Sequence, residues 1–178
     1  MRVFARKGFH ASRVGDIAEE AGVAHGLLYH YFKSKDQVLE AVFHDNWSML
    51  LARIESVEEN DEPAADQLRH IAAIVLRTWL HLPDVVRVVI QEFGRSPELA
   101  ERIGELAQPI DSISRVIERG IERGEFKKVD PRVAATVVYG SIDELLTAWV
   151  LGRLPGSEQD VAAAERTLLE VSLLGLQA

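Results

Sequence analysis

The feature that most constrains this chain is a short amphipathic segment that ends at a glycine and runs directly into a second helical segment. In residues 14–21, apolar side chains recur at i, i+3, i+4 and i+7, which is the spacing of one helix face. Gly22 follows at once, and a glycine there can adopt the left-handed conformation that ends a helix and turns the chain sharply. With a second helix expected over residues 24–31, the pattern predicts a helix-turn-helix.

The second helix is short, and its two faces differ in character. We expect Leu28 and the pair Tyr31-Phe32 to face the core. The opposite side presents His25, Gly26, Tyr29 and His30. An exposed helix of this length, with aromatic and imidazole side chains beside a glycine, suits the major groove of DNA.

The first 35 residues also resemble a known family. The matching residues, in order and spacing, are Gly8-Phe9, Ile17-Ala18, Ala21-Gly22-Val23, Tyr29, Tyr31-Phe32 and Lys33-Ser34-Lys35. This is similar to the N-terminal signature of TetR-type bacterial transcriptional regulators, which implies a DNA-binding head of three helices. The resemblance puts the DNA-facing positions at Ser12, Arg13, His25, Gly26, Leu27, Tyr29, His30, Lys33 and Lys35. It implies that Tyr29 and Lys35 hold phosphates, and that His25 and Gly26 approach base edges.

Three departures from the family's pattern keep an alternative open. The first helix has only two turns before Gly8, where such regulators usually carry further residues, and it depends on packing of Val3 and Phe4. Ala24 stands where many relatives have a capping serine, and Leu27 where a threonine or serine commonly reaches phosphate. The alternative is a helical lipid or small-molecule carrier whose decayed head does not bind DNA.

The charge distribution favours a nucleic-acid partner for the head. The whole chain has a formal net charge of −8. Residues 1–35 hold six basic and three acidic side chains, a net +3, whereas the remainder holds fourteen and twenty-five, a net −11. A mildly basic head on an acidic body presents one end of the molecule to phosphates.

Composition excludes several classes of protein. The chain has 178 residues, 47% of them hydrophobic, which is enough for a sizeable core. It has no cysteine, so disulfides, thiolate metal sites and cysteine nucleophiles are excluded, and a reducing cytoplasm is the expected location. We expect no membrane partner, because no apolar run approaches a membrane span and basic residues interrupt the opening segment.

Periodicity predicts an all-α fold of about nine helices. After residue 31, helices are expected over residues 35–58, 64–82, 83–93, 97–107, 109–123, 131–151 and 158–176. No segment alternates as a strand does. We expect a helix-turn-helix DNA-binding domain over residues 1–45, with a shortened first helix, and a ligand-binding and dimerisation domain over residues 46–178.

The sequence gives no indication of catalysis. It has no glycine-rich phosphate loop, no nucleophile elbow and no His-Glu-x-x-His helix. The Glu-x-x-His pairs of helical di-iron sites are also missing, because Ala41, Gln67 and Thr78 stand three residues before the histidines of the body. We therefore expect neither an enzyme nor a metal site nor a cofactor.

The body resembles one branch of the TetR-type regulators, namely repressors of fatty-acid degradation that long-chain acyl-CoA releases from DNA. The matching residues are Gly120 to Gly124, Phe126, Asp130, Ala134, Tyr139 to Glu144 and Trp149-Val150. The resemblance implies an acyl-CoA or fatty acid as effector. The expected ligand pocket comprises Trp79, Phe93, Tyr139, Asp143 and Trp149.

Other roles remain open for these pocket residues. The simpler alternative is that the aromatic side chains fill a solid core, because large aromatic residues are commonly buried. Asp143 is suited to pairing with an arginine, contacting a ligand or facing a partner subunit. A CoA head group needs basic side chains, for which the candidates by composition are Arg87, Arg95, Arg102, Arg115 and Arg119. A free fatty acid needs fewer of them and is the main alternative ligand.

The last two helices predict a homodimer. Small residues at Gly140, Ser141, Ala148 and Gly152 allow close approach, and an apolar stripe comprises Val161, Ala164, Leu168, Val171, Ser172 and Gly175. Paired with their two-fold copies, these helices are expected to form a four-helix bundle. The alternative is burial of the stripe within one protomer. In the dimer, two heads would bind a palindromic operator in double-stranded DNA, and the effector would spread them apart.

Overall fold

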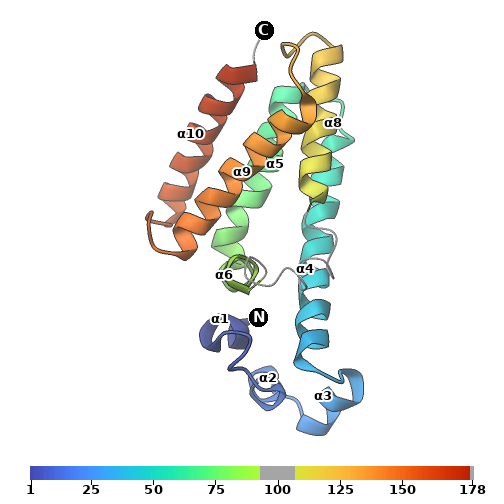
Figure 1. Cartoon of the computed structure of the whole chain (residues 1–178), viewed down its shortest axis with the longest axis vertical. Helices are drawn as coiled ribbons and strands as arrows, with labels where there is room; N and C mark the ends of the chain where they lie inside the picture. Colours follow the sequence, from blue (N-terminus) through green and yellow to red (C-terminus); the bar gives the residue numbers. More distant parts are fainter. Residues whose placement is uncertain (93–106, 177–178) are drawn as a thin grey trace. The chain divides into compact units, whose positions relative to one another are not determined.

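The computed structural model describes residues 1–92 and 107–176, and within these ranges the chain is helical (Figure 1). The helices are α1 (Arg2–Lys7), α2 (Val14–Ala21), α3 (His25–Tyr31), α4 (Lys35–Glu58), α5 (Ala64–His81), α6 (Pro83–Glu92), α8 (Gln108–Glu122), α9 (Pro131–Val150) and α10 (Glu158–Leu176). The expected all-α fold is confirmed. The helix expected over residues 97–107 falls almost entirely outside the described residues, as do Phe93, Arg95 and Arg102.

The chain divides into two compact units. The first unit contains Met1–Ser48 together with the segment that begins at Leu82 and includes α6. The second contains Met49–His81 and the C-terminal helices from α8 onward. Helix α4 is continuous from Lys35 to Glu58, so it begins in the first unit and ends in the second.

The first unit contains the helix-turn-helix that the sequence predicted. Gly22 ends α2 with a φ of 67°, in the left-handed region, and its backbone N–H bonds back to Ala18 and Glu19. At the other end of α2, the Asp16 carboxylate accepts the backbone N–H of Arg13 at 2.9 Å. Helix α3 begins after Ala24, which supplies no side-chain cap, as expected for an alanine at that position.

The short helix α1 is held by packing and by ion pairs. Val3 and Phe4 are buried, and the rings of Phe4 and Phe9 lie 5.7 Å apart. Arg2 pairs with Glu20 of α2 at 2.9 Å. Lys7 pairs with Asp16 at 2.9 Å. A two-turn helix is unstable alone, so these contacts explain why residues 2–7 are helical.

Helix α6 is tied to the loop between α1 and α2. The carboxylate of Glu92, its last residue, accepts the backbone N–H of Phe9 at 3.1 Å. This bond joins residues that are 83 positions apart in the chain. Sequence patterning did not indicate that α6 belongs with the head.

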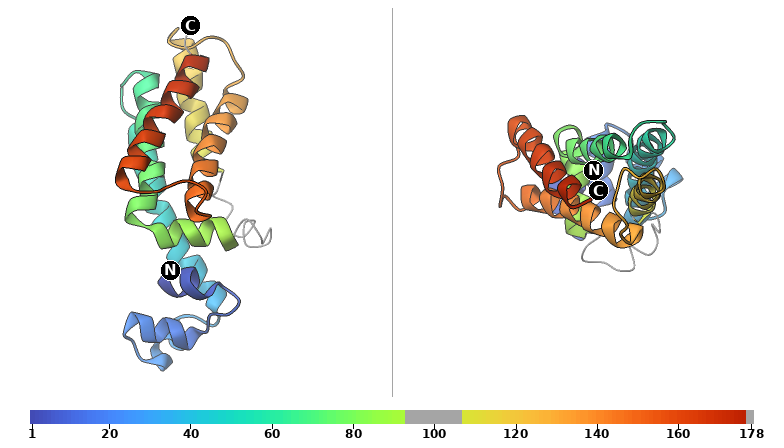
Figure 2. Two further views of the ribbon diagram at one scale, coloured as in Figure 1. Left: turned by 90° about the vertical axis from the view of Figure 1, so that its left-hand side faces the viewer. Right: turned by 90° about the horizontal axis from the view of Figure 1, so that it is seen from above.

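The second unit is a bundle of α5, α8, α9 and α10 with the end of α4. Its fully buried side chains include Ile71 of α5, Ile117 of α8 and Ile142 of α9. Both views of Figure 2 show α10, in red, beside α9, in orange. Helix α9 starts with Pro131 after Asp130, whose carboxylate accepts the Val133 backbone N–H at 2.9 Å.

Helix α9 is the one described helix that is long and apolar enough to cross a membrane by length and composition. The expectation that no apolar run approaches this length was therefore wrong. Within the bundle, α9 buries Val138, Ile142, Leu146 and Trp149, among others. This burial on one side is typical of a core helix in a protein that does not span a membrane.

Candidate functional site

Helix α3 is exposed on all sides except at Leu28. None of its seven residues is buried, and His25, Gly26, Leu27, Tyr29 and His30 are all solvent-exposed. Leu28 is half-buried, which agrees with the expectation that it faces the core. The structure thus brings the predicted α3 residues together on one open surface, where they can reach a large partner.

Tyr31 lies on the exposed side, and the expectation that it packs into the core was wrong. Its side chain is 70% exposed, the largest exposed fraction among the aromatic residues of α3. Its ring meets that of His30 edge to face at 5.3 Å. The physical reason is the end of the helix, because Tyr31 is the last residue of α3 and the following Phe32 turns inward and is half-buried. Tyr31 is therefore a candidate contact that sequence patterning missed.

Lys35 faces the protein. Its Nζ donates to the backbone carbonyl oxygens of Phe9 at 2.7 Å and His10 at 2.9 Å, with a longer bond to Ser12 at 3.4 Å. The ammonium also lies 4.5 Å from the centroid of the Phe9 ring. The Lys35 ammonium thus donates its hydrogen bonds to the loop before α2, whereas the sequence analysis predicted that it would bind a DNA phosphate.

Ser12 belongs to the same loop and is buried, with 3% exposure. Its hydroxyl donates to the Gly8 carbonyl oxygen at 2.6 Å. By contrast, Arg13 and Lys33 are exposed. The structure separates the nine predicted DNA-facing residues into seven on the surface and two, Ser12 and Lys35, that hold the loop.

The Asp16 carboxylate at the start of α2 carries a charge that the head stabilises. The hydrogen bond from Lys7 holds its pKa below the ordinary value, and the Arg13 backbone N–H adds to the effect. The local positive potential of a helix N-terminus acts in the same direction. The start of α2 is consequently fixed next to the predicted DNA-facing surface.

The predicted pocket residues do not converge on one place. Trp79 and Trp149 lie together, with ring centroids 6.3 Å apart, and Trp79 Nε1 donates to the Gly156 carbonyl oxygen at 3.0 Å. The loop after α9 thus rests on the Trp79 ring. Tyr139 lies ten residues before Trp149 on α9, which is about 15 Å along the helix axis.

Tyr139 and Asp143 form a second group on α9, one helical turn apart. Burial raises the pKa of the Tyr139 hydroxyl, and the Asp143 charge raises it further. Partial burial also raises the pKa of Asp143, with a smaller contribution from the adjacent Glu144. Asp143 lies on the exposed side of α9 and forms no ion pair with an arginine of residues 1–92 and 107–176.

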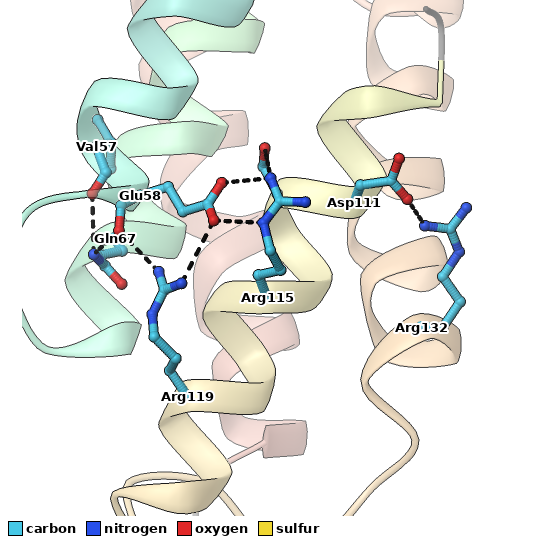
Figure 3. Close-up of polar contacts among 8 residues, drawn as sticks. Val57, Glu58, Gln67, Asp111, Arg115, Arg119 and Arg132 are labelled. Carbon is cyan, nitrogen blue, oxygen red and sulfur yellow. Dashed lines mark hydrogen bonds and ion pairs between the residues drawn. The ribbon is translucent and has the colours of Figure 1, made fainter.

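Two of the arginines proposed for a CoA head group are used within the bundle (Figure 3). Arg115 Nε lies 2.5 Å from Glu58 Oε1, and Arg115 Nη2 lies 2.8 Å from Oε2, a two-point contact. Arg119 donates to the Glu58 backbone carbonyl oxygen at 2.8 Å. Burial acts to raise the pKa of Glu58, but these arginines and Ser112 outweigh it, so the pKa lies below its ordinary value.

The amide of Gln67 completes this cluster at the end of α4. Its Nε2 donates to the carbonyl oxygens of Val57 at 3.0 Å, Glu58 at 3.1 Å and Asn60 at 2.6 Å. Val57 and Glu58 are the last two residues of α4, where the helix leaves carbonyl oxygens without helical partners. The cluster therefore anchors the end of α4, and both of its arginines already bind Glu58. A third candidate, Arg87, contacts Asp84 at 3.3 Å.

The apolar stripe of α10 is split between two faces. Val161 and Leu168 are buried inside the protomer, Leu168 with 7% exposure, and Ala148 of α9 is buried as well. The expectation that these residues lie on an outer seam was wrong, because they pack into the bundle. Val171 of the stripe is exposed, as are Leu174 on the same helix and Val133 and Val137 on α9.

Sequence comparison places both units in one family. Residues 1–42 match the family described as "Bacterial regulatory proteins, tetR family", and residues 61–150 match the "Tetracyclin repressor-like, C-terminal domain". The second match alone covers half of the chain. The chain belongs to the TetR family.

Relatives and solved structures support the assignment over the full length. The fatty acid metabolism regulator protein of Bacillus subtilis strain 168 is 30% identical over 182 residues, covering 99% of this chain and 91% of that protein. The crystal structure of the Bacillus subtilis regulator FadR in complex with stearoyl-CoA has a TM-score of 0.86 at 29% identity, covering 98% and 94%. FadR of Bacillus halodurans has a TM-score of 0.84 at 27% identity, covering 99% and 95%.

Membership of the TetR family decides the class of function. The chain is a DNA-binding transcriptional regulator and not an enzyme, as the sequence predicted. The comparisons favour this interpretation over the carrier alternative, because the similarity includes the DNA-binding head. Two features of the TetR fold here were not apparent in the sequence, the exposure of Tyr31 and the inward position of Lys35.

Proposed function

We propose that the chain is a homodimeric repressor that a long-chain acyl-CoA, or a similar lipophilic ligand, releases from palindromic operator DNA. The observation that carries the effector class is the full-length similarity to a regulator whose structure contains stearoyl-CoA. That similarity covers the body as well as the head, with a TM-score of 0.86. Because the proposed partner is genomic DNA, the cytoplasm is the proposed location.

The DNA contacts follow from which side chains are exposed. We assign base edges to His25 and Gly26 at the start of α3, and phosphates to Tyr29, Arg13 and Lys33. His30, Leu27 and Tyr31 lie on the same helix and complete the surface. Lys35 and Ser12 act indirectly, by holding the loop before α2 in shape. Two heads about 34 Å apart would then meet successive major grooves.

The dimer interface that we propose is the exposed face of α9 and α10. On α9, Val133 and Val137 are followed by Gly140 one turn later, and on α10 the face contains Val171 and Leu174. A Cβ at Gly140 would meet no atom within 4 Å in the protomer, so a neighbouring helix could approach closely there. Packed against their two-fold copies, these helices would form a four-helix bundle, which removes exposed aliphatic surface from water.

Release from DNA requires an effector that distinguishes two arrangements of the heads. A ligand that binds the spread arrangement more tightly lowers operator affinity, at most by the ratio of its affinities for the two arrangements. Operator DNA must lower the effector affinity by the same factor. An acyl tail contributes roughly 0.8 kcal/mol per buried methylene, so release should become steeply more effective with tail length for as long as each added methylene is buried.

A titration of the operator complex tests the effector class. Octanoyl-, lauroyl- and palmitoyl-CoA and the three matching free acids are added to protein bound to a fluorescent operator duplex, and anisotropy is recorded. We expect release at progressively lower concentrations from octanoyl- to palmitoyl-CoA. Release by the free acids alone would point to a fatty-acid effector. Release that does not depend on tail length, or no release by any ligand, would contradict the acyl-CoA assignment and leave DNA binding unaffected.

A further inference from the structure

Gly15 and His25 lie against each other across the helix-turn-helix. Gly15 is the second residue of α2, and His25 is the first residue of α3. A Cβ at position 15 would lie 2.9 Å from Cε1 of the His25 ring, 3.4 Å from Nδ1 and 3.8 Å from Nε2. Carbon atoms in favourable contact are about 3.5–4.0 Å apart. The imidazole therefore occupies space that any other side chain at position 15 would need.

The backbone gives no other reason for glycine at this position. The glycines with positive φ in the described residues are Gly8, Gly22, Gly124 and Gly152, so Gly15 has ordinary helical geometry. Glycine is among the poorest helix formers in such a position. At Gly22 and Gly26, the other two glycines of the helix-turn-helix, a Cβ would meet nothing within 4 Å. Of the three glycines in this motif, only Gly15 has a side chain where its own Cβ would be.

We propose that Gly15 is a specificity-determining residue for DNA recognition, because the space it leaves sets the position of the His25 imidazole. This inference rests on the proposed function, in which His25 approaches base edges. His25 is solvent-exposed, and its ring lies over Gly15 in the space that a side chain at that position would fill. A ring held against one helix has fewer orientations than a freely rotating one, and a hydrogen bond to a base edge depends on its orientation.

Substitution of Gly15 by alanine should move the ring and leave the helix in place. The nearest atom to the added methyl is in the outer part of a side chain with two rotatable bonds, so the imidazole can rotate away. Alanine is also the best helix former, which favours retention of α2. G15A is accordingly expected to fold, and to alter DNA recognition through His25 without itself touching a base.

The test compares wild type, G15A, H25A and the double variant G15A/H25A. A preferred palindrome is first selected by the wild-type protein from a duplex pool with a randomised centre. The dissociation constants of all four proteins are then measured for this duplex and for its single-base variants at one salt concentration. Thermal unfolding followed by circular dichroism checks that each protein is folded. If G15A is not folded, G15S replaces it as the variant that adds a Cβ at this position.

We expect H25A to reduce discrimination at one base pair of each half-site by on the order of fivefold or more. G15A should change the relative affinities at that same base pair, and the change should be absent when G15A is introduced into H25A. The double variant therefore separates an effect through the imidazole from any effect of the methyl itself.

Four outcomes would overturn the inference. If H25A alters base preference but G15A does not, Gly15 has no role in specificity and the proposed function stands. If G15A acts equally with and without His25, its effect does not pass through the imidazole. If the wild-type protein selects no sequence, or if H25A leaves every relative affinity unchanged, the proposed role of His25 fails and the inference fails with it.

Discussion

Replacement of Lys35 by methionine separates a positioning role from a phosphate contact. Methionine keeps an unbranched apolar stem and removes the ammonium that donates to Phe9, His10 and Ser12. A hydrogen bond to a charged group contributes about 1.5–3 kcal/mol, and a cation–π contact about 0.5–1 kcal/mol near the surface. These contacts share one half-buried ammonium and do not add fully, so we expect K35M to lower the free energy of unfolding by about 2–3 kcal/mol.

Lys33 supplies the matched control. It is exposed, and within the described residues its ammonium forms no hydrogen bond or ion pair, although its backbone N–H donates to Gln37 at 2.8 Å. K33M should therefore leave stability unchanged. If Lys33 contacts a phosphate, K33M should reduce the slope of log affinity against log salt by about 0.9 per protomer. K35M should leave that slope unchanged and weaken binding to all sequences alike.

Urea unfolding and operator affinity at several salt concentrations measure the two quantities. The reasoning fails if K35M unfolds at the same urea concentration as wild type and also flattens the salt slope by about one. Lys35 would then leave its intramolecular acceptors to bind DNA, as the family resemblance alone had implied.

Four further substitutions test the body. Leu174 is 73% exposed in the protomer, so L174E should yield a folded monomer in sedimentation, whereas L168A should lower stability by about 2–5 kcal/mol through a core cavity; a dimeric L174E protein would contradict the proposed interface. The pKa of Glu58 is lowered, so its ion pairs stabilise the fold at neutral pH and this stabilisation is lost as pH falls below about 4.5. In urea unfolding, E58Q should therefore lose less stability on acidification than wild type does. A Cβ at Gly156 would lie 2.6 Å from Trp79 Nε1, so G156A should displace the indole and shift its fluorescence, and an unchanged spectrum would refute this contact.

The sequence alone was sufficient for features that depend on neighbouring residues. The turn between α2 and α3 needs a positive φ directly after α2, and Gly22 supplies it at 67°. Likewise, the start of α9 follows from Asp130 and Pro131, which cap and begin the helix. Such features could be predicted because their stabilising bonds span only a few residues, and the family resemblance added the order of the helices.

Features that depend on contacts between distant residues could not be predicted from sequence. Lys35 turns inward because carbonyl oxygens some 25 positions earlier in the chain accept hydrogen bonds from its ammonium group. Arg115 is paired within the bundle because the carboxylate of Glu58, 57 positions away, accepts its hydrogen bonds. An apolar stripe shows that a helix buries one face, but it does not show which residues that face contains. In the structure Leu168 is buried and Leu174 is exposed. Only the packing of α10 in the bundle determines which leucine enters the core. The hydrophobic effect is non-directional, so the positions of the neighbouring helices decide which side of α10 is buried.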